Sequence, residues 1–345
     1  MAKRVRISAD DGTAWYTLPG NTAEMSNEAG ELDDTIFGQD FSSTFPGLIG
    51  WTINANGLFK GYAGYVTTIK KAGTSTVMTA EPMSLVAGKT YQITAATKRM
   101  MNRAVTTSVL DNAVAVAVSN IQNIDWLFGR VTFVPGYTPT GPITLTGAYF
   151  PTAAVGCANS FTLTQTANAI DNTCMDTAQV NDGHRTFEYG LKTVSLDLEG
   201  IFKTSNGFRD LVISRSEVII EIDLAGDGKN VARGFFRAAN TNQSGDVGDL
   251  EQETITFNLS VPDSDVAVAY PFSWLIASDS TMSQALRIAI AAWQSADEID
   301  VQYLPDGVTG VEGDAIITDL SLAGGLEAMN EFTINFQGSG ELASV

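Results

Sequence analysis

The stretch that decides the fold is IDVQYLPDGVTGVEGDAIITDLSLAGGLEAMNEFTINF, residues 299–336. It aligns without a gap to residues 220–257, which lie 79 positions upstream. The coinciding landmarks are Asp306-Gly307 with Asp227-Gly228, Gly313 with Gly234, Gly324 with Gly245, and Ile334-Asn335-Phe336 with Ile255-Thr256-Phe257. Alternation, turn residues and spacing repeat although few side chains are identical. This pattern is expected of a duplicated fold whose surfaces have diverged.

A second repeat, at an offset of 143, covers a strand that precedes each of these hairpins. Gly47-Leu48 aligns with Gly190-Leu191, and Gly57-Leu58-Phe59-Lys60 aligns with Gly200-Ile201-Phe202-Lys203. Between these landmarks apolar and polar residues alternate in both copies, which is typical of a half-buried β-strand.

The two offsets predict a nested duplication and a mainly β fold class. Residues 1–65 plus 265–345 form one discontinuous β-sandwich or barrel domain, residues 151–262 form its sister, and residues 66–150 form an inserted β domain. Each sister carries one flanking helix, expected over 206–217 and 281–295, the latter with Ser280 as N-cap. A simple tandem, in which 66–150 is a degenerated back half, is the alternative.

The insertion has its own pattern of expected elements. Short apolar runs predict strands at 65–69, 113–118, 130–134 and 143–148. A basic helix is expected over 95–103, and Asp125–Gly129 is expected to form a turn that enters the next strand.

Composition excludes several classes of protein. The 345 residues carry 39 acidic and 20 basic side chains, a formal charge of −19, which argues against a sequence-reading nucleic-acid binder. No secretory signal peptide and no membrane-spanning apolar run is visible. The two cysteines, Cys157 and Cys174, are expected to be free thiols of a protein assembled in a reducing cytoplasm.

An acidic run lies in the N-terminal segment, at Glu24, Glu28, Glu31, Asp33 and Asp34. A run of this kind is usually a solvated loop. The alternative is an arm that docks on a neighbouring subunit.

Little in the sequence points to catalysis or to a metal. One histidine, His184, provides too little material for a zinc site or a Ser-His-Asp triad. Asp223 with Asp227-Gly228 resembles the start of a calcium loop, but a glutamate at its twelfth position is missing, and Asp-Gly favours a hairpin turn. Asp197 and Glu199, on one strand face about 6–7 Å apart, have a spacing that suits a glycosidase pair.

The order of these elements, and above all the closing Phe332–Gly340 and Gly190-Leu191 with the alternating strand after it, resembles the major tail tube proteins of long-tailed, non-contractile bacteriophages. The resemblance leaves out 66–150. It implies a virion protein whose sheets join those of its neighbours, six domains to a ring, and whose stacked rings conduct DNA. Two such domains in one chain imply a trimeric, pseudo-hexameric ring. The implied partners are the chain itself, a tape-measure protein, tail terminator and tail-tip proteins, and double-stranded DNA in passage. No cofactor, metal or membrane is implied, and no enzyme activity.

Two groups of residues are candidates for that function. Polar side chains that alternate with apolar ones are expected to line an acidic bore that repels phosphate: Asn54, Asn56, Asp197, Glu199, Glu221, Asp223 and Asp300. The inter-subunit candidates are the acidic run together with Phe332, Ile334 and Phe336.

Two other classes of function stay open at this point. One is a β-rich virion protein that binds or cleaves glycans, with 66–150 as its recognition domain. The other is a monomeric enzyme that uses Asp197 and Glu199.

Overall fold

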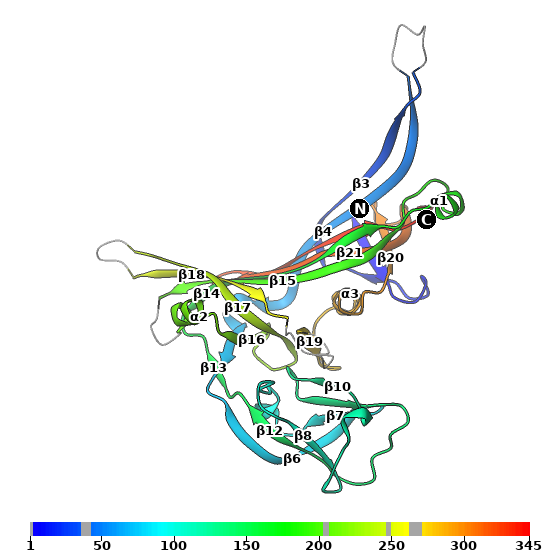
Figure 1. The fold of residues 1–345 in the computed structure, drawn as a ribbon. Coiled ribbons are helices and arrows are strands. Elements are labelled where there is room, and N and C mark those ends of the chain that lie inside the picture. The colour runs from blue at the N-terminus through cyan, green and yellow to red at the C-terminus, as the bar shows by residue number, and fades with distance from the viewer. Residues whose placement is uncertain (1–2, 36–42, 203–206, 246–249, 262–270) are drawn as a thin grey trace. The chain divides into compact units, whose positions relative to one another are not determined.

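The computed structural model describes residues 3–35, 43–202, 207–245, 250–261 and 271–345 (Figure 1). The chain is mainly β, as predicted, with three short α-helices among the described residues. It divides into two compact units. Unit 1 comprises residues 1–64, 161–195 and 280–345, and unit 2 comprises residues 65–160 and 196–279. The division falls inside two long strands, β14 (Ala158–Asp171) and β15 (Phe187–Ile201).

Unit 1 is a β-sheet unit with two helices. Besides its parts of β14 and β15 it contains β1 (Arg4–Ser8), β2 (Tyr16–Thr17), β3 (Gly20–Asp33), β4 (Thr44–Ala63), α1 (Met175–Val180), α3 (Gln284–Ser295), β20 (Ile299–Leu304), β21 (Val311–Gly325), β22 (Met329–Gly338) and β23 (Ala343–Ser344).

The strands of unit 1 run β2-β1-β20-β21-β22-β4-β3, and neighbours in this order are antiparallel. β14 lies on β21, and β23 pairs with the start of β21. Helix α3 contacts β1, β2 and β21. Its side chains Leu286, Ile290 and Trp293 are buried, which confirms the helical face expected there.

Unit 2 contains the inserted segment and a second sheet. Its elements are β5 (Thr68–Ala72), β6 (Thr76–Ala87), β7 (Thr90–Ile93), β8 (Ser108–Asp111), β9 (Val114–Ala115), β10 (Ile121–Asp125), β11 (Arg130–Phe133), β12 (Ile143–Tyr149), β13 (Thr152–Ala154), α2 (Phe208–Ser214), β16 (Glu217–Asp223), β17 (Asn230–Ser244), β18 (Gln252–Leu259) and β19 (Phe272–Ile276), with single turns of 3₁₀-helix at Gly64–Val66, Ala96–Lys98 and Val118–Asn120.

Two sheets make up unit 2. The first runs β13-β5-β16-β17-β18-β15, with β19 also on β17, and α2 contacts β17. The second runs β10-β11-β7-β6-β12-β8-β9 and encloses its own apolar core, which includes Ile93, Phe133 and Leu145. A further cluster joins Leu127 and Phe128 of the inserted segment to β16 and β17.

The repeat at offset 79 is present in the strand register. In unit 2, Ala238 pairs with Phe257 and Asn240 with Thr256, so the strand bulges at the residue between. In unit 1, Ile317 pairs with Phe336 and Asp319 with Asn335, with the same bulge. Each of these four residues in unit 1 lies 79 positions after its counterpart in unit 2. A bulge is a specific feature of backbone pairing, and its recurrence at matched positions shows that the two hairpins are one structure used twice.

The repeat at offset 143 is also present in the strand contacts, at positions consistent with the repeat at offset 79. Asn335 lies opposite Asn54 of β4. Its sister Thr256 donates its hydroxyl to Asp197 of β15 at 2.6 Å. Asn54 and Asp197 are 143 positions apart, so β4 and β15 occupy equivalent places. Lys203, the end of that repeat, and residues 262–270, where two predicted domains meet, lie outside the described residues.

Several local predictions are wrong. The basic helix expected over 95–103 is only a turn of 3₁₀-helix at Ala96–Lys98, and 113–118 is a two-residue strand followed by a second such turn. Helix α3 starts later than expected, because Ser283 rather than Ser280 is the N-cap and accepts from Leu286 N at 3.3 Å.

The predicted solvated loop at 24–34 is also wrong. Residues 24–33 belong to β3, which pairs with β4 as far as Asp33↔Thr44, and Asp34 directly follows it. The carboxylates of the acidic run are exposed. Charged exposed side chains do not prevent backbone pairing, and the partner strand decides the conformation. The turn at Asp125–Gly129 is confirmed, since Asp125 accepts from Leu127 N and Phe128 N.

Candidate functional site

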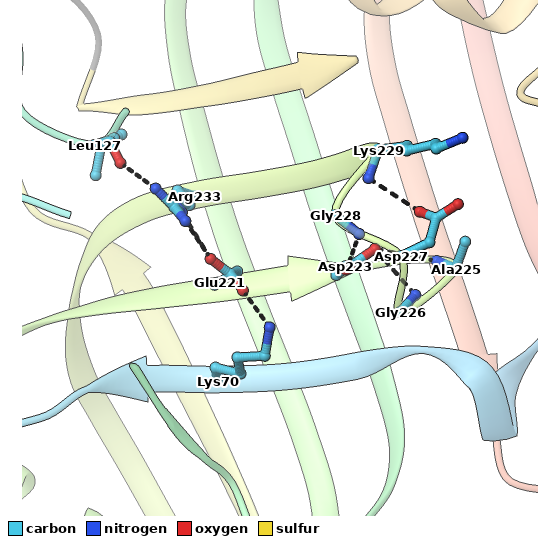
Figure 2. A network of polar contacts seen from close by, with 10 residues as sticks. All are labelled: Lys70, Leu127, Glu221, Asp223, Ala225, Gly226, Asp227, Gly228, Lys229 and Arg233. Atoms are coloured by element: carbon cyan, nitrogen blue, oxygen red, sulfur yellow. Dashed lines mark hydrogen bonds and ion pairs between the residues drawn. The ribbon is translucent and has the colours of Figure 1, made fainter. Parts of the chain in front are cut away.

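A row of three charges, centred on a buried glutamate, crosses the first sheet of unit 2. Lys70 of β5, Glu221 of β16 and Arg233 of β17 are directly opposite one another on three adjacent strands. Lys70 Nζ lies 2.8 Å from Glu221 Oε1, and Arg233 donates to Glu221 Oε2 at 2.5 Å (Figure 2). Burial raises the pKa of Glu221, but Arg233 and Lys70 outweigh it, so the pKa of the carboxyl lies below its ordinary value.

This row also anchors the inserted segment. Arg233 Nη1 donates to the carbonyl of Leu127 at 2.6 Å (Figure 2). Its guanidinium lies 4.8 Å from the Phe128 ring centroid. A second pair joins Arg103 to Glu217 at the start of β16, with the Arg103 guanidinium 4.2 Å from the Phe235 ring centroid. The insertion is thus held on β16 and β17 by cations that are desolvated, paired and stacked.

Asp223 ends β16 and organises the hairpin turn that follows. Its carboxylate accepts from Ala225 N at 3.3 Å, Gly226 N at 3.0 Å and Gly228 N at 2.7 Å (Figure 2). Both glycines have positive φ, at 68° and 75°, where a side chain would be strained. The hairpin interpretation is therefore confirmed over the calcium loop.

Two of the residues expected to face a bore are placed differently. Glu221 is 4% and Asp223 1% exposed, and β16 is buried along almost its whole length. β5 and β17 pair with its two edges, and Leu127 and Phe128 of the inserted segment pack in one cluster with its Ile219. Their carboxylates bind partners inside unit 2 and do not reach solvent. Strand alternation predicted a solvated face here, and nothing in residues 220–223 indicates that the inserted segment packs on this strand.

The remaining polar-face candidates reach solvent. Glu199 and Asn54 are exposed, while Asn56, Asp197 and Asp300 are half-buried. Asn56 donates to Thr22 at 3.2 Å, and Glu199 accepts from Ser160 at 3.1 Å. Asn54 and Asn56 lie on β4, Asp197 and Glu199 on β15, and Asp300 on β20, so these three strands each keep an accessible polar position.

Phe332, Ile334 and Phe336 are buried in unit 1, at 2%, 0% and 1% exposure. β22 has β21 on one edge and β4 on the other, and Phe332 packs edge-on against Phe59 at 5.9 Å. Their side chains stabilise unit 1 and are not available to a neighbour, so we remove them from the inter-subunit candidates.

The functional feature that the sequence did not indicate is a pair of strand edges that lack a partner strand in the described chain. β3 pairs with β4, and no strand of the described chain lies on its other edge. On β17, the edge that pairs with β16 ends its pairing at Arg237, while the opposite edge continues with β18 to Ser244. Unpaired backbone groups of this kind are templates for another strand.

Metal ligands and membrane-spanning helices were the other features to look for in the described residues. In the part of the chain that the structure describes, no three His, Cys, Asp or Glu residues are arranged to hold a metal ion, and no helix is long and apolar enough to cross a membrane. Both cysteines are free and exposed, as expected. His184 bonds to the carbonyl of Asn181 in a loop, through its Nδ1 at 2.9 Å.

The fold and these edges define a mainly β chain with a duplicated hairpin and two unpaired strand edges. No protein-family model and no curated protein matches it. Among solved structures, a chain in the virion of a native gene transfer agent particle aligns at 14% identity over 32% of this chain and 85% of its own, with a TM-score of 0.29. A chain in the tail of an empty gene transfer agent particle, refined with C6 symmetry, aligns at 14% over 32% and 83%, with a TM-score of 0.28. TM-scores this low carry no argument about architecture.

Proposed function

We propose that the protein is a structural virion protein, the major tail tube subunit of a long, non-contractile phage tail. Three copies form a ring of six equivalent domains, and stacked rings conduct DNA. The single observation that carries the proposal is the pairing of β14 with β21 inside the chain. The strands equivalent to these two, β3 and β17, each have an edge without a partner in the described chain.

The internal junction joins β14 to β21. The part of β14 from Phe161 onward and all of β21 lie in unit 1, where buried Gln165 donates through Nε2 to the carbonyl of Leu320 at 3.3 Å. The repeats assign β14 to the 151–262 copy and β21 to the terminal copy. The pairing is therefore the contact by which one copy of the duplicated domain meets the next.

The sister of β21 is β17, because the hairpin bulges match at offset 79. The segment of β21 that receives β14 contains Leu320, whose sister is Thr241. Thr241 pairs with Ile255 of β18 on one edge, and in the described chain β16 does not reach it on the other. The edge of β21 that pairs with β14 therefore has an equivalent edge on β17, and that edge has no partner strand in the described chain.

The sister of β14 is β3, because β4 and β15 are equivalent and each pairs with one of them. The hydroxyls of Thr166 and Thr193 are 2.6 Å apart, which aligns Gln165 with Val194. Val194 is 143 positions after Trp51, and Trp51 pairs with Asn27. Asn27 is therefore the sister of Gln165, and it is exposed where Gln165 is buried.

A chain with β3 at one open edge and β17 at the other has a heterologous interface. When the same interface relates each domain to the next by a constant rotation, the assembly closes into a ring if these rotations add up to a full turn. Pairing every edge removes the templates for uncontrolled aggregation. Three internal β14–β21 junctions and three β3–β17 junctions between copies then make six equivalent contacts.

The charge of the chain suits a conduit. A formal charge of −19 and polar side chains at Asn54, Asn56, Asp197 and Glu199 on the accessible strand faces would repel a phosphate backbone rather than bind it. Within this proposal those residues, with Asp300, line the bore, and the acidic run of β3 belongs to the contact between subunits. The tape-measure, terminator and tip proteins are its partners during assembly in the host cytoplasm.

Electron microscopy of the purified protein, combined with mass photometry, tests the proposal. We expect rings or tubes with apparent sixfold symmetry whose ring mass equals three chains. Rings of six chains would contradict the internal duplication as the basis of symmetry. A monomer at every concentration up to the solubility limit would contradict the tube itself.

A further inference from the structure

The equivalence of β3 and β14 is supported by the backbone around two glycines. A side chain added at Gly57 of β4 would meet the carbonyl of Pro19, and one added at Gly200 of β15 would meet the carbonyl of Cys157. Pro19 and Cys157 directly precede β3 and β14. The glycines are 143 positions apart and the carbonyls 138 apart, which is also the offset given by the strand pairings. The internal junction and the contact between copies can therefore be compared residue by residue.

The register of the internal junction follows from two contacts. Gln165 of β14 donates to the carbonyl of Leu320 of β21, and a side chain added at Gly324 would meet the Phe161 ring. The residue number falls by four along β14 while it rises by four along β21, so the two strands run antiparallel. Leu163 therefore lies opposite the residue midway between these two contacts.

A row of large apolar side chains closes the internal junction. Leu163 lies opposite Leu322 of β21, and Leu322 pairs with Phe332 of β22. The three side chains are 0%, 1% and 2% exposed. Phe332 pairs with Gly57 of β4, and its ring occupies the space that a side chain there would need. Burial of this apolar row stabilises the junction inside the chain.

The equivalent row at the open edge of β17 is polar. The repeat at offset 79 places Gln243 where unit 1 has Leu322, and Glu253 where unit 1 has Phe332. Gln243 and Glu253 pair with each other in the same register as their counterparts. Glu253 and Gly200 line one small hollow, so the glycine is present in unit 2 although the ring is replaced by a carboxylate.

Glu253 is a buried carboxylate that has no ion pair among the described contacts. It is 5% exposed, and its Oε1 accepts from Thr241 at 3.1 Å and from Gln243 at 3.3 Å. Both donors belong to β17, where Gln243 is exposed and Thr241 half-buried. A strand that adds to this edge covers the donors of the carboxylate. Burial of a charge and an amide without a cation is unfavourable.

We propose that Thr241, Gln243 and Glu253 weaken the addition of a second copy's β3 to β17, so that the contact between copies is reversible while the internal junction is permanent. The offset of 138 brings Met25 of the second copy opposite Gln243, as Leu163 lies opposite Leu322 inside the chain. The incoming methionine thus meets an amide and a carboxylate where the internal leucine meets two apolar side chains.

The polar row also protects the free chain. An exposed strand edge with an apolar face is a template for uncontrolled association, and charged or polar side chains at such an edge prevent it. Leucine at Thr241 and Gln243, as at the equivalent positions of β21, would leave an apolar face at the open edge of every unassembled copy. The three residues therefore keep separate copies apart until their concentration is high enough to overcome the weaker contact.

This inference rests on the proposed function, because it concerns the strength of one contact of the assembly. Its test compares self-association by sedimentation velocity over a dilution series. Thr241→Leu with Gln243→Leu and Glu253→Phe gives β17 and β18 the residues of unit 1, and should lower the midpoint concentration of association at least about tenfold. The control Thr254→Leu with Asn258→Leu adds two leucines at exposed positions of β18, away from the open edge, and should leave the midpoint unchanged.

Two further variants keep the test decisive if the triple variant folds poorly. Gln243→Leu changes only an exposed side chain and should lower the midpoint about threefold, since one amide is replaced by an apolar group. Met25→Glu, added to either variant, should cancel the gain, because it places a charge opposite the new leucine at the contact. The melting temperature of each dilute variant shows that it is folded.

The outcomes separate this inference from the proposed function. If the wild type and every variant stay monomeric at all concentrations, the tube proposal fails and this inference fails with it. If the wild type forms rings and the triple and single variants share its midpoint, only this inference is overturned. If the variants associate more strongly but Met25→Glu does not reverse the gain, the leucines act away from β3, and the inference is again overturned.

Discussion

Phe257 and Phe336, 79 positions apart, occupy the same place in two hairpins. Each lies opposite the residue that precedes a β-bulge, Ala238 for Phe257 and Ile317 for Phe336, and the next residue pair in each hairpin resumes beyond that bulge. Both rings are buried, at 0% and 1% exposure. The duplicated hairpin therefore rests on two equivalent aromatic positions, which can be tested separately.

Truncation of either ring should destabilise its own unit. Phe257→Ala and Phe336→Ala each remove a buried aromatic side chain, so we expect each to lower the free energy of unfolding by about 3–5 kcal/mol. Chemical denaturation followed by tryptophan fluorescence measures the change. The control Phe45→Ala removes an exposed ring, 62% accessible, and a comparable loss there would show that burial is not the cause.

Breaking the row in unit 2 should be costly. Glu221→Gln leaves Lys70 and Arg233 next to a neutral group in a desolvated place, for which we expect a loss of about 3–5 kcal/mol in unfolding free energy. Asp279→Asn breaks the exposed Lys229–Asp279 pair, which solvent screens, so its loss should change the unfolding free energy far less. Equal losses in the two variants would mean that the buried row does not anchor the insertion.

Release of the inserted segment should accompany that loss. Leu127 and Phe128 depend on Arg233 for a carbonyl partner and a stacked cation. Hydrogen exchange at 121–133 should therefore accelerate in Glu221→Gln and stay unchanged in Asp279→Asn. Unchanged protection in both variants would assign the docking of the insertion to its apolar contacts alone.

The junction between copies can be trapped covalently. On a background in which Cys157 and Cys174 are serine, Asn27→Cys with Thr241→Cys should oxidise to a disulfide-linked ladder, because the equivalent internal position joins Gln165 to Leu320. Either single variant is the control and should give at most dimers. A double variant that stays monomeric under oxidation while rings form would place the contact between copies on other strands.

The monomer should respond to pH through Asp314. Burial, and then the carboxylate of Asp300 opposite it, raise the pKa of Asp314 to about 6, above the usual 3.8 of an aspartate, so the folded state binds the proton more tightly than the unfolded state does. The stabilisation is complete below pH 3.8 and is lost as pH rises through 6. The melting temperature of the wild type relative to Asp314→Asn should fall across that window at concentrations below association. A flat difference would show that Asp300 and Asp314 do not share a proton.

Much of the fold could be predicted from the sequence because duplication leaves landmarks. The glycines and Asp-Gly turns recur at fixed offsets, since a turn with positive φ or a close backbone approach tolerates few other residues. Helical spacing predicted the buried face of α3, because burial acts on each side chain through its place in the local period. The same period did not show that the apolar face of β22, with Phe332, Ile334 and Phe336, is covered within unit 1 rather than by a neighbouring subunit.

The candidate site was less accessible to that reasoning, because burial by a distant segment leaves no mark in the strand it covers. Nothing within 220–223 signals that Lys70 and Leu127 cover that strand, and nothing near Glu24 signals that β4 pairs with β3. The sequence by itself determined that one β hairpin is used twice. Only the tertiary structure decided which edges stay open, and that Asp300 faces another carboxylate where Glu221 faces an arginine, because strand partners are set by contacts between residues far apart in the chain.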